Sequence, residues 1–459
     1  MQVCFDQDLV VRYGGRGPRY TSYPTALQFH DRLTEAEYRE KARASNNSGM
    51  PLSLYIHIPF CHSLCYYCGC NKIVTRNEQR VARYLEMLYK EIRMQAELFD
   101  DSRKVEQLHF GGGTPTYLDK EQLGALMQHL RASFNFDESE NHEFSIEVDP
   151  RTVDAERIRE LRELGFNRLS LGIQDFDEPV QKAVNRMQSP AEVQAQVDAA
   201  RTAGFGSISF DLIYGLPHQT VESFDKTLNI VIAMQPDRLA VYNYAHLPQR
   251  FKGQRMISAD DIPPPETKLD LLHHTIDKLC GVGYVYIGMD HFALPDDELV
   301  RARQDGTLQR NFQGYSTHRQ CDLVALGVSG IGEIGNMFAQ NSVSTIEYED
   351  LIERGKLPIR KGLLVDDDDL IRAAVIQDLM CYDNLSFDDF SEKHGIDFRE
   401  YFGAEIDKLK VLEDDGLIEL SDAGITITPQ GRLLLRNIAM TFDRYIDLEE
   451  NDSRFSKAI

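Results

Sequence analysis

Four cysteines crowd into a short segment near the start of the chain, and three of them have a spacing that suits an iron–sulfur cluster. Residues 57–70 read His-Ile-Pro-Phe-Cys-His-Ser-Leu-Cys-Tyr-Tyr-Cys-Gly-Cys, so Cys61, Cys65 and Cys68 form a Cys-x3-Cys-x2-Cys pattern. Three thiolates on one tight loop can bind three irons of a [4Fe–4S] cubane and leave the fourth iron without a protein ligand. We therefore predict that these three cysteines hold such a cluster.

The open iron defines the chemistry that the cluster would support. S-adenosylmethionine (SAM) can chelate such an iron through its amino and carboxylate groups, and an electron from the reduced cluster then breaks a C–S bond and releases a 5′-deoxyadenosyl radical. The alternative is a structural zinc site, which needs four ligands, usually as two separated pairs. Cys70 or His62 is available as a fourth ligand, but no second Cys or His pair follows at a suitable spacing.

These cysteines need a scaffold, and the sequence predicts an α/β one. Short β-rich runs alternate with helical patterns at intervals of roughly 30 residues, which is typical of βα units on a parallel sheet. Six such units can curve into a partial (β/α)6 TIM-like barrel, where chemistry lies at the ends of the strands. The expected strands are 52–58, 105–110, 144–148, 168–173, 208–213 and 239–242, and the expected helices are 81–98, 120–133, 154–164, 190–203 and 221–234.

Glycines and polar residues follow successive predicted strands. The run 111–115 (Gly-Gly-Gly-Thr-Pro) ends the second strand, Glu147 ends the third, Gln174 and Asp175 follow the fourth, and Asp211 lies late in the fifth. Glycines let a backbone approach a ligand closely, and polar side chains around a barrel rim suit a ribose and an amino-acid group. Each of these residues taken singly is an ordinary loop residue, but together with the cysteines they predict a SAM pocket.

The chain is predicted to have three parts. Residues 1–50 are polar and turn-rich and form an N-terminal extension expected to cover the substrate, residues 51–360 form the barrel with its extension, and residues 361–459 form a mostly helical domain. Helices followed by a β-hairpin resemble a winged-helix module, for which a lid or packing role is favoured over DNA binding. Beyond the barrel strands, the expected elements are strand-like runs over 284–288, 417–420 and 425–428 and helices over 371–381, 401–414 and 429–443.

The composition disfavours several classes of function. The formal net charge is −23 and the pI about 5.0, so the protein has no global electrostatic attraction to nucleic acid or anionic lipid. No apolar run is long enough for a membrane span, and the acidic first ten residues do not read as a signal peptide. The eight cysteines are too unevenly spread for a disulfide framework. We therefore expect a reducing compartment, the cytoplasm.

Beyond the individual motifs, the sequence resembles the oxygen-independent coproporphyrinogen III oxidase family of radical SAM enzymes almost from end to end. The resemblance implies an enzyme that oxidatively decarboxylates two propionates of coproporphyrinogen III to vinyl groups, giving protoporphyrinogen IX in anaerobic haem synthesis. It also implies that the deoxyadenosyl radical abstracts a hydrogen β to the pyrrole ring. The segments that carry it are the cysteine run, 111–116, 147–150, 210–217 (Phe-Asp-Leu-Ile-Tyr-Gly-Leu-Pro), 242–248, 310–315 (Arg-Asn-Phe-Gln-Gly-Tyr), 17–26 and the C-terminal helical module.

By motif position, the resemblance implies cofactor contacts and two molecules of SAM. Cys70 and Tyr55 are its candidate catalytic residues, and Cys70 distinguishes oxidases from shorter relatives that bind haem; the alternative for Cys70 is a structural thiol. The contacts expected for the cluster-bound SAM are Tyr67, Gly113, Thr114, Gln174, Arg186, Asp211 and Ala245, and those for the second SAM are Tyr55, Gly112, Glu147 and Ile331.

The four propionates of such a substrate need cationic partners, because unpaired carboxylates are costly to bury. Arg16, Arg19 and Arg310 are the candidates, since a guanidinium group binds a carboxylate in a bidentate way. The expected partners are a reducing electron donor such as a flavodoxin or ferredoxin system and an electron acceptor of unknown identity, and the expected state is a monomer. Side chains that could line the macrocycle cavity are Tyr20, Tyr23, Tyr244 and His291.

Three other functions compete with the oxidase. The first is a haem-binding or trafficking protein that keeps the cluster, against which Cys70 and the segment 14–26 argue. The second is a radical SAM enzyme with another bulky substrate, such as a haem-degrading methyltransferase. The third is a zinc-bound structural or DNA-binding protein, which iron and sulfide analysis would exclude.

Overall fold

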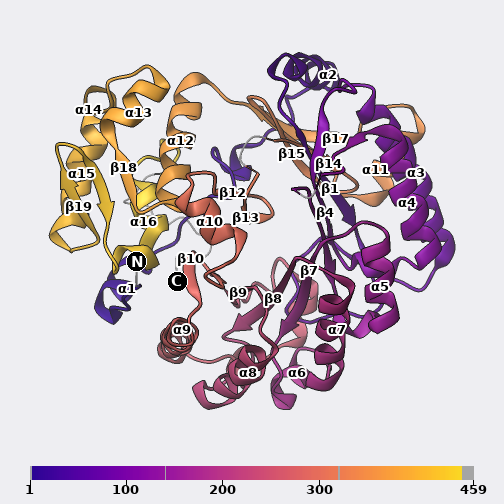
Figure 1. Ribbon diagram of the computed structural model, residues 1–459, viewed down its shortest axis with the longest axis horizontal. Coiled ribbons are helices and arrows are strands. Elements are labelled where there is room, and N and C mark those ends of the chain that lie inside the picture. Colours follow the sequence, from indigo (N-terminus) through magenta and orange to yellow (C-terminus); the bar gives the residue numbers. More distant parts are fainter. Residues whose placement is uncertain (1–2, 140, 319–320, 447–459) are drawn as a thin grey trace. The chain divides into compact units, whose positions relative to one another are not determined.

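The computed structural model describes residues 3–139, 141–318 and 321–446, and its contacts divide the chain into two compact units. We call 29–263 with 320–364 the barrel unit, and 1–28 with 264–319 and 365–459 the composite unit (Figure 1). The division into 1–50, 51–360 and 361–459 stays a prediction. Among the described residues, no helix combines the length and the apolar character that a membrane crossing requires.

The barrel unit contains the six predicted parallel strands in the spatial order β9-β8-β7-β6-β4-β1. Helices that follow these strands in sequence lie on the outer side of the sheet (Figure 1), as the alternating pattern predicts. The α/β arrangement of six βα units expected from the sequence is therefore confirmed. The strands are β1 (Leu52–Ile58), β4 (Lys104–Gly112), β6 (Glu143–Val148), β7 (Arg168–Gln174), β8 (Ser207–Tyr214) and β9 (Arg238–Asn243), and the helices are α3 (Glu78–Ala96), α4 (Lys120–Ser133), α5 (Ala155–Glu163), α6 (Glu178–Ala183), α7 (Pro190–Ala203) and α8 (Val221–Met234).

Local chemistry explains where these elements begin and which faces they bury. In β7, buried and half-buried residues alternate along the strand, as expected for a strand with one face against the core. Asp119, Ser189 and Thr220 each cap a helix, at the start of α4, α7 and α8, with a side chain that accepts from the backbone N–H three residues later. The βα loops therefore start and stop at defined positions, which fixes the residues at the strand ends.

Four further strands extend the sheet beyond β1, and they were missed as individual elements. β14 (Asp322–Leu326) pairs in parallel with β1, and β15 (Ile331–Ile334), β16 (Met337–Asn341) and β17 (Ile359–Leu364) continue antiparallel. They are short and interrupted by glycine turns, so the alternation of apolar and polar residues that marks a strand is hard to detect in the sequence. The remaining elements of this unit are α2 (Glu35–Ala44), β2 (Phe60–Cys61), β3 (Ile73–Val74), β5 (Asn135–Phe136) and α11 (Thr345–Glu353).

A buried carboxylate of α3 ties this extension to the barrel. Glu91 accepts hydrogen bonds from the backbone N–H of Gly327 at 2.7 Å, from the hydroxyl of Tyr348 at 2.6 Å and from the side-chain amide of Asn341 at 2.7 Å. Its side chain is fully buried. The three donors satisfy the carboxylate and hold the turn between β14 and β15, which carries the chain to Ile331.

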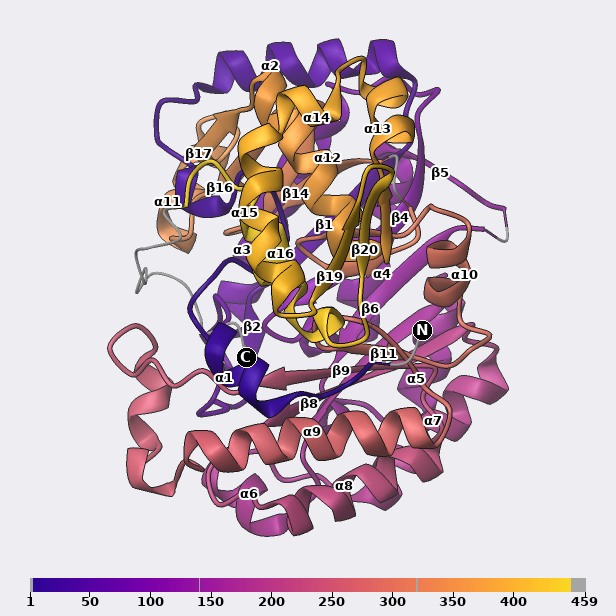
Figure 2. The ribbon, with the colours of Figure 1, turned by 90° about the vertical axis from the view of Figure 1, so that its left-hand side faces the viewer.

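The composite unit has a winged-helix-like portion formed by helices and a small antiparallel sheet in the order β18-β20-β19 (Figure 2). Two hairpins, β10 with β11 and β12 with β13, belong to the same unit. Its strands are β10 (Val285–Gly288), β11 (His291–Ala293), β12 (Gln309–Asn311), β13 (Gly314–Ser316), β18 (Asn384–Ser386), β19 (Ile418–Ser421) and β20 (Gly424–Ile427), and its helices are α1 (Gln7–Tyr13), α9 (Pro265–Gly281), α10 (Glu298–Gln304), α12 (Asp367–Cys381), α13 (Phe387–His394), α14 (Phe398–Tyr401), α15 (Gly403–Asp414) and α16 (Leu435–Met440).

Two details of this portion differ from the sequence prediction. The single helix expected over 429–443 is a 3-10 turn over Gly431–Leu434 followed by α16. A Cβ on Gly431 would lie 1.9 Å from the Leu417 carbonyl oxygen, so this close backbone contact requires glycine at the start of the segment. Strand β18, a third strand of the wing sheet, was also missed because it spans only three residues.

Candidate functional site

The cysteine loop leaves the carboxyl end of β1 and is fixed by the glycine run that ends β4. Gly113 N–H donates to the Ile58 carbonyl at 2.8 Å, and Thr114 N–H donates to the Phe60 carbonyl at 2.9 Å. A Cβ on Gly113 would lie 2.7 Å from the Pro59 carbonyl carbon, so the approach of the two chains requires glycine. The start of the loop is therefore bound to the edge where chemistry is expected in parallel barrels.

The outer part of the same loop is held by two other barrel segments. Tyr66 N–H donates to the Val184 carbonyl at 3.0 Å, and Asn185 donates its side-chain amide to the Leu64 carbonyl at 2.8 Å. The Gln254 amide donates to the carbonyls of both Tyr67 and Ala245, at 2.8 and 3.2 Å. Gln254, which the sequence analysis missed, therefore joins two predicted SAM contacts.

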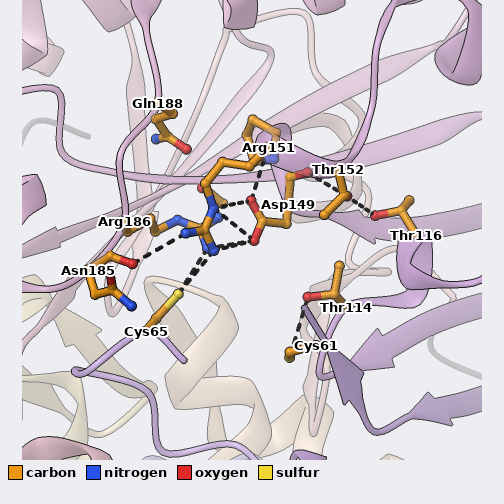
Figure 3. Close-up of polar contacts among 12 residues, drawn as sticks. Cys61, Cys65, Thr114, Thr116, Asp149, Arg151, Thr152, Asn185, Arg186 and Gln188 are labelled. Atoms are coloured by element: carbon orange, nitrogen blue, oxygen red, sulfur yellow. Dashed lines mark hydrogen bonds and ion pairs between the residues drawn. The ribbon is translucent and has the colours of Figure 1, made fainter. Parts of the chain in front are cut away.

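Two guanidinium groups converge on the sulfur of Cys65 (Figure 3). Arg151 Nη2 lies 3.3 Å and Arg186 Nη1 3.4 Å from Cys65 Sγ. Asp149 Oδ2 accepts from both arginines, at 2.7 and 3.1 Å, and this buried carboxylate aims them at the sulfur. On the opposite side in Figure 3, the Thr114 hydroxyl lies 3.5 Å from Cys61 Sγ.

The surroundings shift the thiol pKa values in opposite directions. Burial raises the pKa of the Cys61 thiol to about 11, whereas a hydrogen bond with Cys70, helped by Lys72, lowers that of Cys68 to about 6. N–H donors and cations beside sulfur stabilise thiolates, the form that binds metal. Three thiols on one loop, supported by Arg151, Arg186, Thr114 and Lys72, fit the donor set that a [4Fe–4S] cluster with one open iron requires.

Glu147 lies at the end of β6 and is held by two neighbours on β4. His109 Nε2 lies 3.2 Å from Glu147 Oε1, and Gly112 N–H donates to Oε2 at 3.2 Å. The other ring nitrogen of His109 lies 2.5 Å from the Ser145 hydroxyl, and its ring stacks on Tyr55 with centroids 5.8 Å apart. Three residues expected to contact the second SAM, Tyr55, Gly112 and Glu147, are thus neighbours, and His109, which the sequence analysis missed, touches two of them.

Tyr55 is also connected to the cysteine loop through a buried histidine. Its hydroxyl lies 3.0 Å from His57 Nδ1, and His57 Nε2 lies 3.0 Å from the carbonyl of Asn71, the residue after Cys70. Gly112 has φ +116°, and a Cβ there would lie 2.8 Å from the His57 ring. His57 therefore connects the candidate catalytic residue Tyr55 to the backbone of Asn71, the neighbour of the other candidate, Cys70.

The rim continues around β7 and β8. Asp211 is half-buried, and burial, followed by the charge of Glu147, raises its pKa to about 7; the Ser170 hydroxyl donates to it at 3.1 Å. Arg186 Nη2 donates to the Gly172 carbonyl at 2.5 Å. Gln174 has a left-handed φ of +67°, a conformation that costs energy for a residue with a side chain and that bends the chain at the end of β7.

The structure thus places most of the predicted cofactor contacts of the barrel unit along one edge, at the carboxyl ends of β1, β4, β6, β7, β8 and β9. Ile331 lies at the start of β15, which pairs with β14 next to β1. Asp149 and Arg151 were missed as functional residues, although they lie only two and four residues after Glu147 in the sequence. His57, His109 and Gln254 had no signal beyond their position, because isolated His and Gln residues are common in any chain.

The aromatic candidates for the macrocycle cavity have other partners. Tyr20 and Tyr23 are buried in the hydrophobic core of the composite unit, where the Tyr20 hydroxyl donates to Asp443 at 2.9 Å. Tyr244 packs in a barrel core cluster, with its hydroxyl 2.9 Å from His246 Nδ1. His291 packs edge-on against Tyr315, with centroids 5.3 Å apart.

The arginine candidates all belong to the composite unit. Arg16 is half-buried on the segment that precedes Arg19, and Arg19 forms an ion pair with Asp290. Arg310 is buried; its Nε donates to the Arg19 carbonyl at 3.1 Å, and its guanidinium lies 5.0 Å from the centre of the Tyr315 ring. The structure therefore brings Arg19 and Arg310 together.

Comparisons with known proteins agree along the whole chain. Residues 55–231 match the radical SAM superfamily, and residues 365–434 match the HemN C-terminal domain. The oxygen-independent coproporphyrinogen III oxidase of Pseudomonas aeruginosa is 53% identical over 457 residues, which cover 100% of this chain and 99% of that protein. The protein of the same description from Escherichia coli K12 is 46% identical over 458 residues, covering 100% and 99%. A solved structure described as coproporphyrinogen III oxidase (HemN) from Escherichia coli, a radical SAM enzyme, superposes with a TM-score of 0.92, covering 97% of this chain and 100% of that one.

Proposed function

Because the chain belongs to the family of oxygen-independent coproporphyrinogen III oxidases, we propose that it converts two propionates of coproporphyrinogen III to vinyl groups and forms protoporphyrinogen IX without oxygen. The observation that carries this proposal is the cysteine loop at the carboxyl edge of the barrel, where Asp149 directs Arg151 and Arg186 toward the sulfur of Cys65. Membership of the radical SAM family implies a [4Fe–4S] cluster and SAM.

We propose Cys61, Cys65 and Cys68 as the cluster ligands. When bound, the cluster and SAM supply a 5′-deoxyadenosyl radical that removes a hydrogen atom from the substrate. Arg151 and Arg186 donate N–H groups toward Cys65 and offset negative charge at that sulfur. Because Arg186, Asp149 and Cys65 are largely buried, these donors act in a medium where electrostatic interactions are strong.

The SAM contacts are proposed in two groups. Gly113 brings backbone within reach of a ligand at the end of β4, and Asp211 offers a carboxylate or, with its raised pKa, a carboxylic acid. Support for the second group comes from the contacts of Glu147 with His109 and Gly112, which set the direction of its carboxylate. The first group comprises Tyr67, Gly113, Thr114, Gln174, Arg186, Asp211 and Ala245, and the second comprises Tyr55, Gly112, Glu147 and Ile331.

Cys70 and Tyr55 are proposed as the catalytic side chains. Cys70 forms a hydrogen bond with Cys68, which raises the pKa of Cys70 well above its ordinary value and keeps it a thiol able to give a proton or a hydrogen atom. Burial likewise raises the pKa of Tyr55. Both residues therefore hold their protons at neutral pH, and His57 orients the Tyr55 hydroxyl.

Arg16, Arg19 and Arg310 are proposed to contact the substrate propionates, since guanidinium groups pair with carboxylates. A flavodoxin or ferredoxin type of donor is proposed for the electron that the cluster needs, with a separate acceptor of unknown identity for the electrons released by decarboxylation. We propose a monomer that works in the cytoplasm, because a cluster with an open iron needs a reducing compartment.

An anaerobic turnover assay tests the proposal. Reduced, cluster-loaded protein receives SAM, coproporphyrinogen III and an electron acceptor from cell extract, and porphyrins are separated after oxidation. We expect protoporphyrin, together with 5′-deoxyadenosine. Deoxyadenosine without a vinyl product would point to another substrate, and the absence of both from a protein with a full cluster would favour a haem carrier instead.

A further inference from the structure

The loop that follows β9 is basic, although the protein as a whole is strongly acidic. Residues 247–256 read Leu-Pro-Gln-Arg-Phe-Lys-Gly-Gln-Arg-Met, and we call them the basic loop. The basic loop carries Arg250, Lys252 and Arg255, and no Asp or Glu occurs from residue 238 to residue 259. In a chain whose formal net charge is −23, this segment is a local reversal of sign. The sequence analysis did not identify its three cations as functional.

The basic loop packs directly on the outer part of the cysteine loop. A Cβ on Gly253 would lie 3.4 Å from Leu64 Cδ1, so the two segments are in close contact there. The Gln254 amide donates to the Tyr67 carbonyl at 2.8 Å. Leu64 and Tyr67 each lie next to a proposed cluster ligand in the sequence. The basic loop is therefore one residue away from two of the three proposed ligands.

The three cations of the basic loop lie at the surface. Arg250, Lys252 and Arg255 are all exposed, and within the part of the chain that the structure describes none of them forms an ion pair. Arg255 Nε donates to the Pro248 carbonyl at 3.0 Å, and the Arg250 guanidinium carbon lies 5.5 Å from the centre of the Phe251 ring. Both contacts are with neutral groups, so the positive charge stays available to a partner.

The neighbouring cysteine loop adds to this positive face. No Asp or Glu occurs from residue 51 to residue 77, and this stretch contains Lys72 and Arg76. Lys72 Nζ donates to the Cys68 carbonyl at 3.0 Å, and Arg76 is exposed. Two segments that pack against each other, one of which holds the proposed cluster ligands, thus contribute cations but no carboxylate.

Exposed apolar side chains mark both ends of the basic loop. Leu247 is 38% exposed and Met256 is 64% exposed. Arg, Met and aromatic residues are enriched where proteins bind each other, and Asp and Glu are depleted there. Arg250, Arg255 and Met256 give the basic loop this composition, which favours a protein over a small anion as its partner.

We propose that the basic loop, with the adjoining surface of the cysteine loop, is the docking surface for a small acidic protein that delivers the electron to the cluster. The inference rests on the proposed function, because a cluster held by Cys61, Cys65 and Cys68 is what needs such a donor. The step moves one electron and no atom: the donor is oxidised by one electron, and the cluster is reduced by one. Local positive charge attracts an acidic donor and speeds its association, although the net charge of the protein repels it.

Two other partners compete for the same cations. A substrate with carboxylate groups would need them for its own binding, whatever the source of the electron. A nucleic acid would bind them through its phosphates. Dithionite distinguishes the donor from the substrate, because this small inorganic reductant needs no docking surface for a protein.

The first part of the test measures binding. A fluorescently labelled flavodoxin of acidic composition is titrated anaerobically into the cluster-loaded protein, and Kd is measured by anisotropy at low ionic strength. Joint replacement of the three cations by Glu (R250E, K252E and R255E) should raise Kd about tenfold, because each exposed charge pair contributes a factor of up to about five. Added salt should weaken wild-type binding toward the value of this triple variant.

The matched control is Lys356→Glu. Lys356 is an exposed cation of the same unit, and it precedes β17, at the opposite end of the barrel unit's strand order from β9. This variant has the same change of charge at one position but should leave the Kd for flavodoxin unchanged. A similar rise in Kd in the control would mean that only the net charge matters, which would overturn the proposal.

The second part of the test measures turnover with two reductants. Protoporphyrin formation is followed with reduced flavodoxin or with dithionite as the source of the electron. The triple variant should need about tenfold more flavodoxin for half of its maximal rate. With dithionite it should keep the wild-type rate and the wild-type KM for coproporphyrinogen III.

Each outcome supports or overturns the docking surface. It is wrong if the triple variant keeps the wild-type Kd, if its KM for coproporphyrinogen III rises with dithionite, or if a DNA duplex binds the cations more tightly than flavodoxin does. It is also wrong if the wild type binds neither the flavodoxin nor an acidic ferredoxin, whereas turnover with dithionite would then still support the proposed function. If the wild type binds flavodoxin through the basic loop but makes no vinyl product, the proposed function fails and the docking surface stands.

A single substitution keeps the test decisive if the triple variant does not fold by circular dichroism or loses its iron. Among the described residues, the Lys252 ammonium group forms no hydrogen bond or ion pair, so Lys252→Glu changes the charge of the basic loop without breaking a contact. We expect this variant to raise the Kd for flavodoxin by a factor of about two to five. An unchanged Kd would overturn the proposal.

Discussion

The cysteine loop of the barrel unit and the arginine cluster of the composite unit, which consists of Arg19, Arg310 and Arg436, both gather chemically active side chains, but they are built in opposite ways. The three proposed cluster ligands lie within residues 61–68, and backbone hydrogen bonds to Ile58, Phe60 and Val184 hold their loop. The arginines come from three segments that lie far apart in sequence and meet only after folding. The first arrangement can be seen in a single line of sequence, whereas the second becomes visible only in the folded unit.

The two regions also differ in the charged partners that their side chains have. Beside the cysteine loop, Asp149 pairs with both Arg151 and Arg186, the two arginines that lie against Cys65. In the arginine cluster, Asp290 is paired with Arg19, and Arg310 Nη1 has no acceptor among the residues that the structure describes. The comparison predicts that the two regions have separable functions, one for the cluster and one for substrate carboxylates.

The largest expected effect is loss of the cluster. Cys61→Ser, Cys65→Ser or Cys68→Ser should each abolish visible Fe–S absorption and bound iron, because each removes one of only three proposed thiolate ligands. Coproporphyrin III binding should persist if the two regions are separable. Iron analysis and a binding titration on the same samples provide the measurement, with exposed Cys4→Ser as the control. A variant that retains a full cluster would show the ligand assignment to be wrong.

Cys70→Ser should separate two functions within the loop itself. The variant should keep the iron, because Cys70 is not among the proposed ligands, but should lose vinyl-product formation because the thiol beside Cys68 is gone. Parallel measurements of iron content and protoporphyrin yield test this expectation. Full turnover would show that Cys70 is only a structural thiol, and loss of iron would show that it is a cluster ligand.

Removal of the buried cation near Cys65 should destabilise the barrel unit. Arg186→Gln removes the hydrogen bonds that the guanidinium group gives to Asp149 and to the Gly172 carbonyl, and the loss of two hydrogen bonds to buried acceptors, one of them charged, should cost about 3 kcal/mol. The control Lys226→Gln breaks the exposed pair with Glu222, whose side chain is 82% exposed, and should cost less than about 1 kcal/mol. Urea denaturation followed by circular dichroism compares the two. Equal effects would mean that the guanidinium beside Cys65 is not structurally important.

An effect of similar size that depends on pH is expected at Glu91, which fastens the β14–β15 turn. Burial raises its pKa to about 7 despite its three hydrogen bonds, against about 4.3 for an ordinary Glu. The folded state therefore binds this proton more tightly, so the associated stability is complete below about pH 4.3 and is lost as the pH rises through about 7. Relative to Glu91→Gln, the wild type should lose about 3 kcal/mol of unfolding free energy between pH 5 and pH 8. A difference that does not change with pH would contradict the expectation.

Local patterns were sufficient to predict the six parallel strands of the barrel. Each βα unit shows the same hydrophobic pattern for a strand, followed by a capping residue and the hydrophobic pattern for a helix. Local patterns were insufficient for β14–β17, where glycine turns interrupt short strands, and for the segment after Pro429, where contact between Gly431 and Leu417 decides the geometry. When cysteines lie in one loop, their spacing alone predicts their chemistry. The functions of Asp149, His109 and Arg436 cannot be predicted in this way, because they depend on neighbours that only the fold supplies.

The most direct test of the central claim follows a hydrogen atom. Coproporphyrinogen III that carries deuterium on the propionate carbons β to the carboxyl group, next to the pyrrole ring, is given to the reduced protein with SAM under anaerobic conditions. We predict deuterium in the 5′-deoxyadenosine that accumulates with the vinyl product, because the radical takes its hydrogen from that position. Vinyl product with unlabelled deoxyadenosine, or deoxyadenosine formed without vinyl product, would contradict the function assigned to this chain.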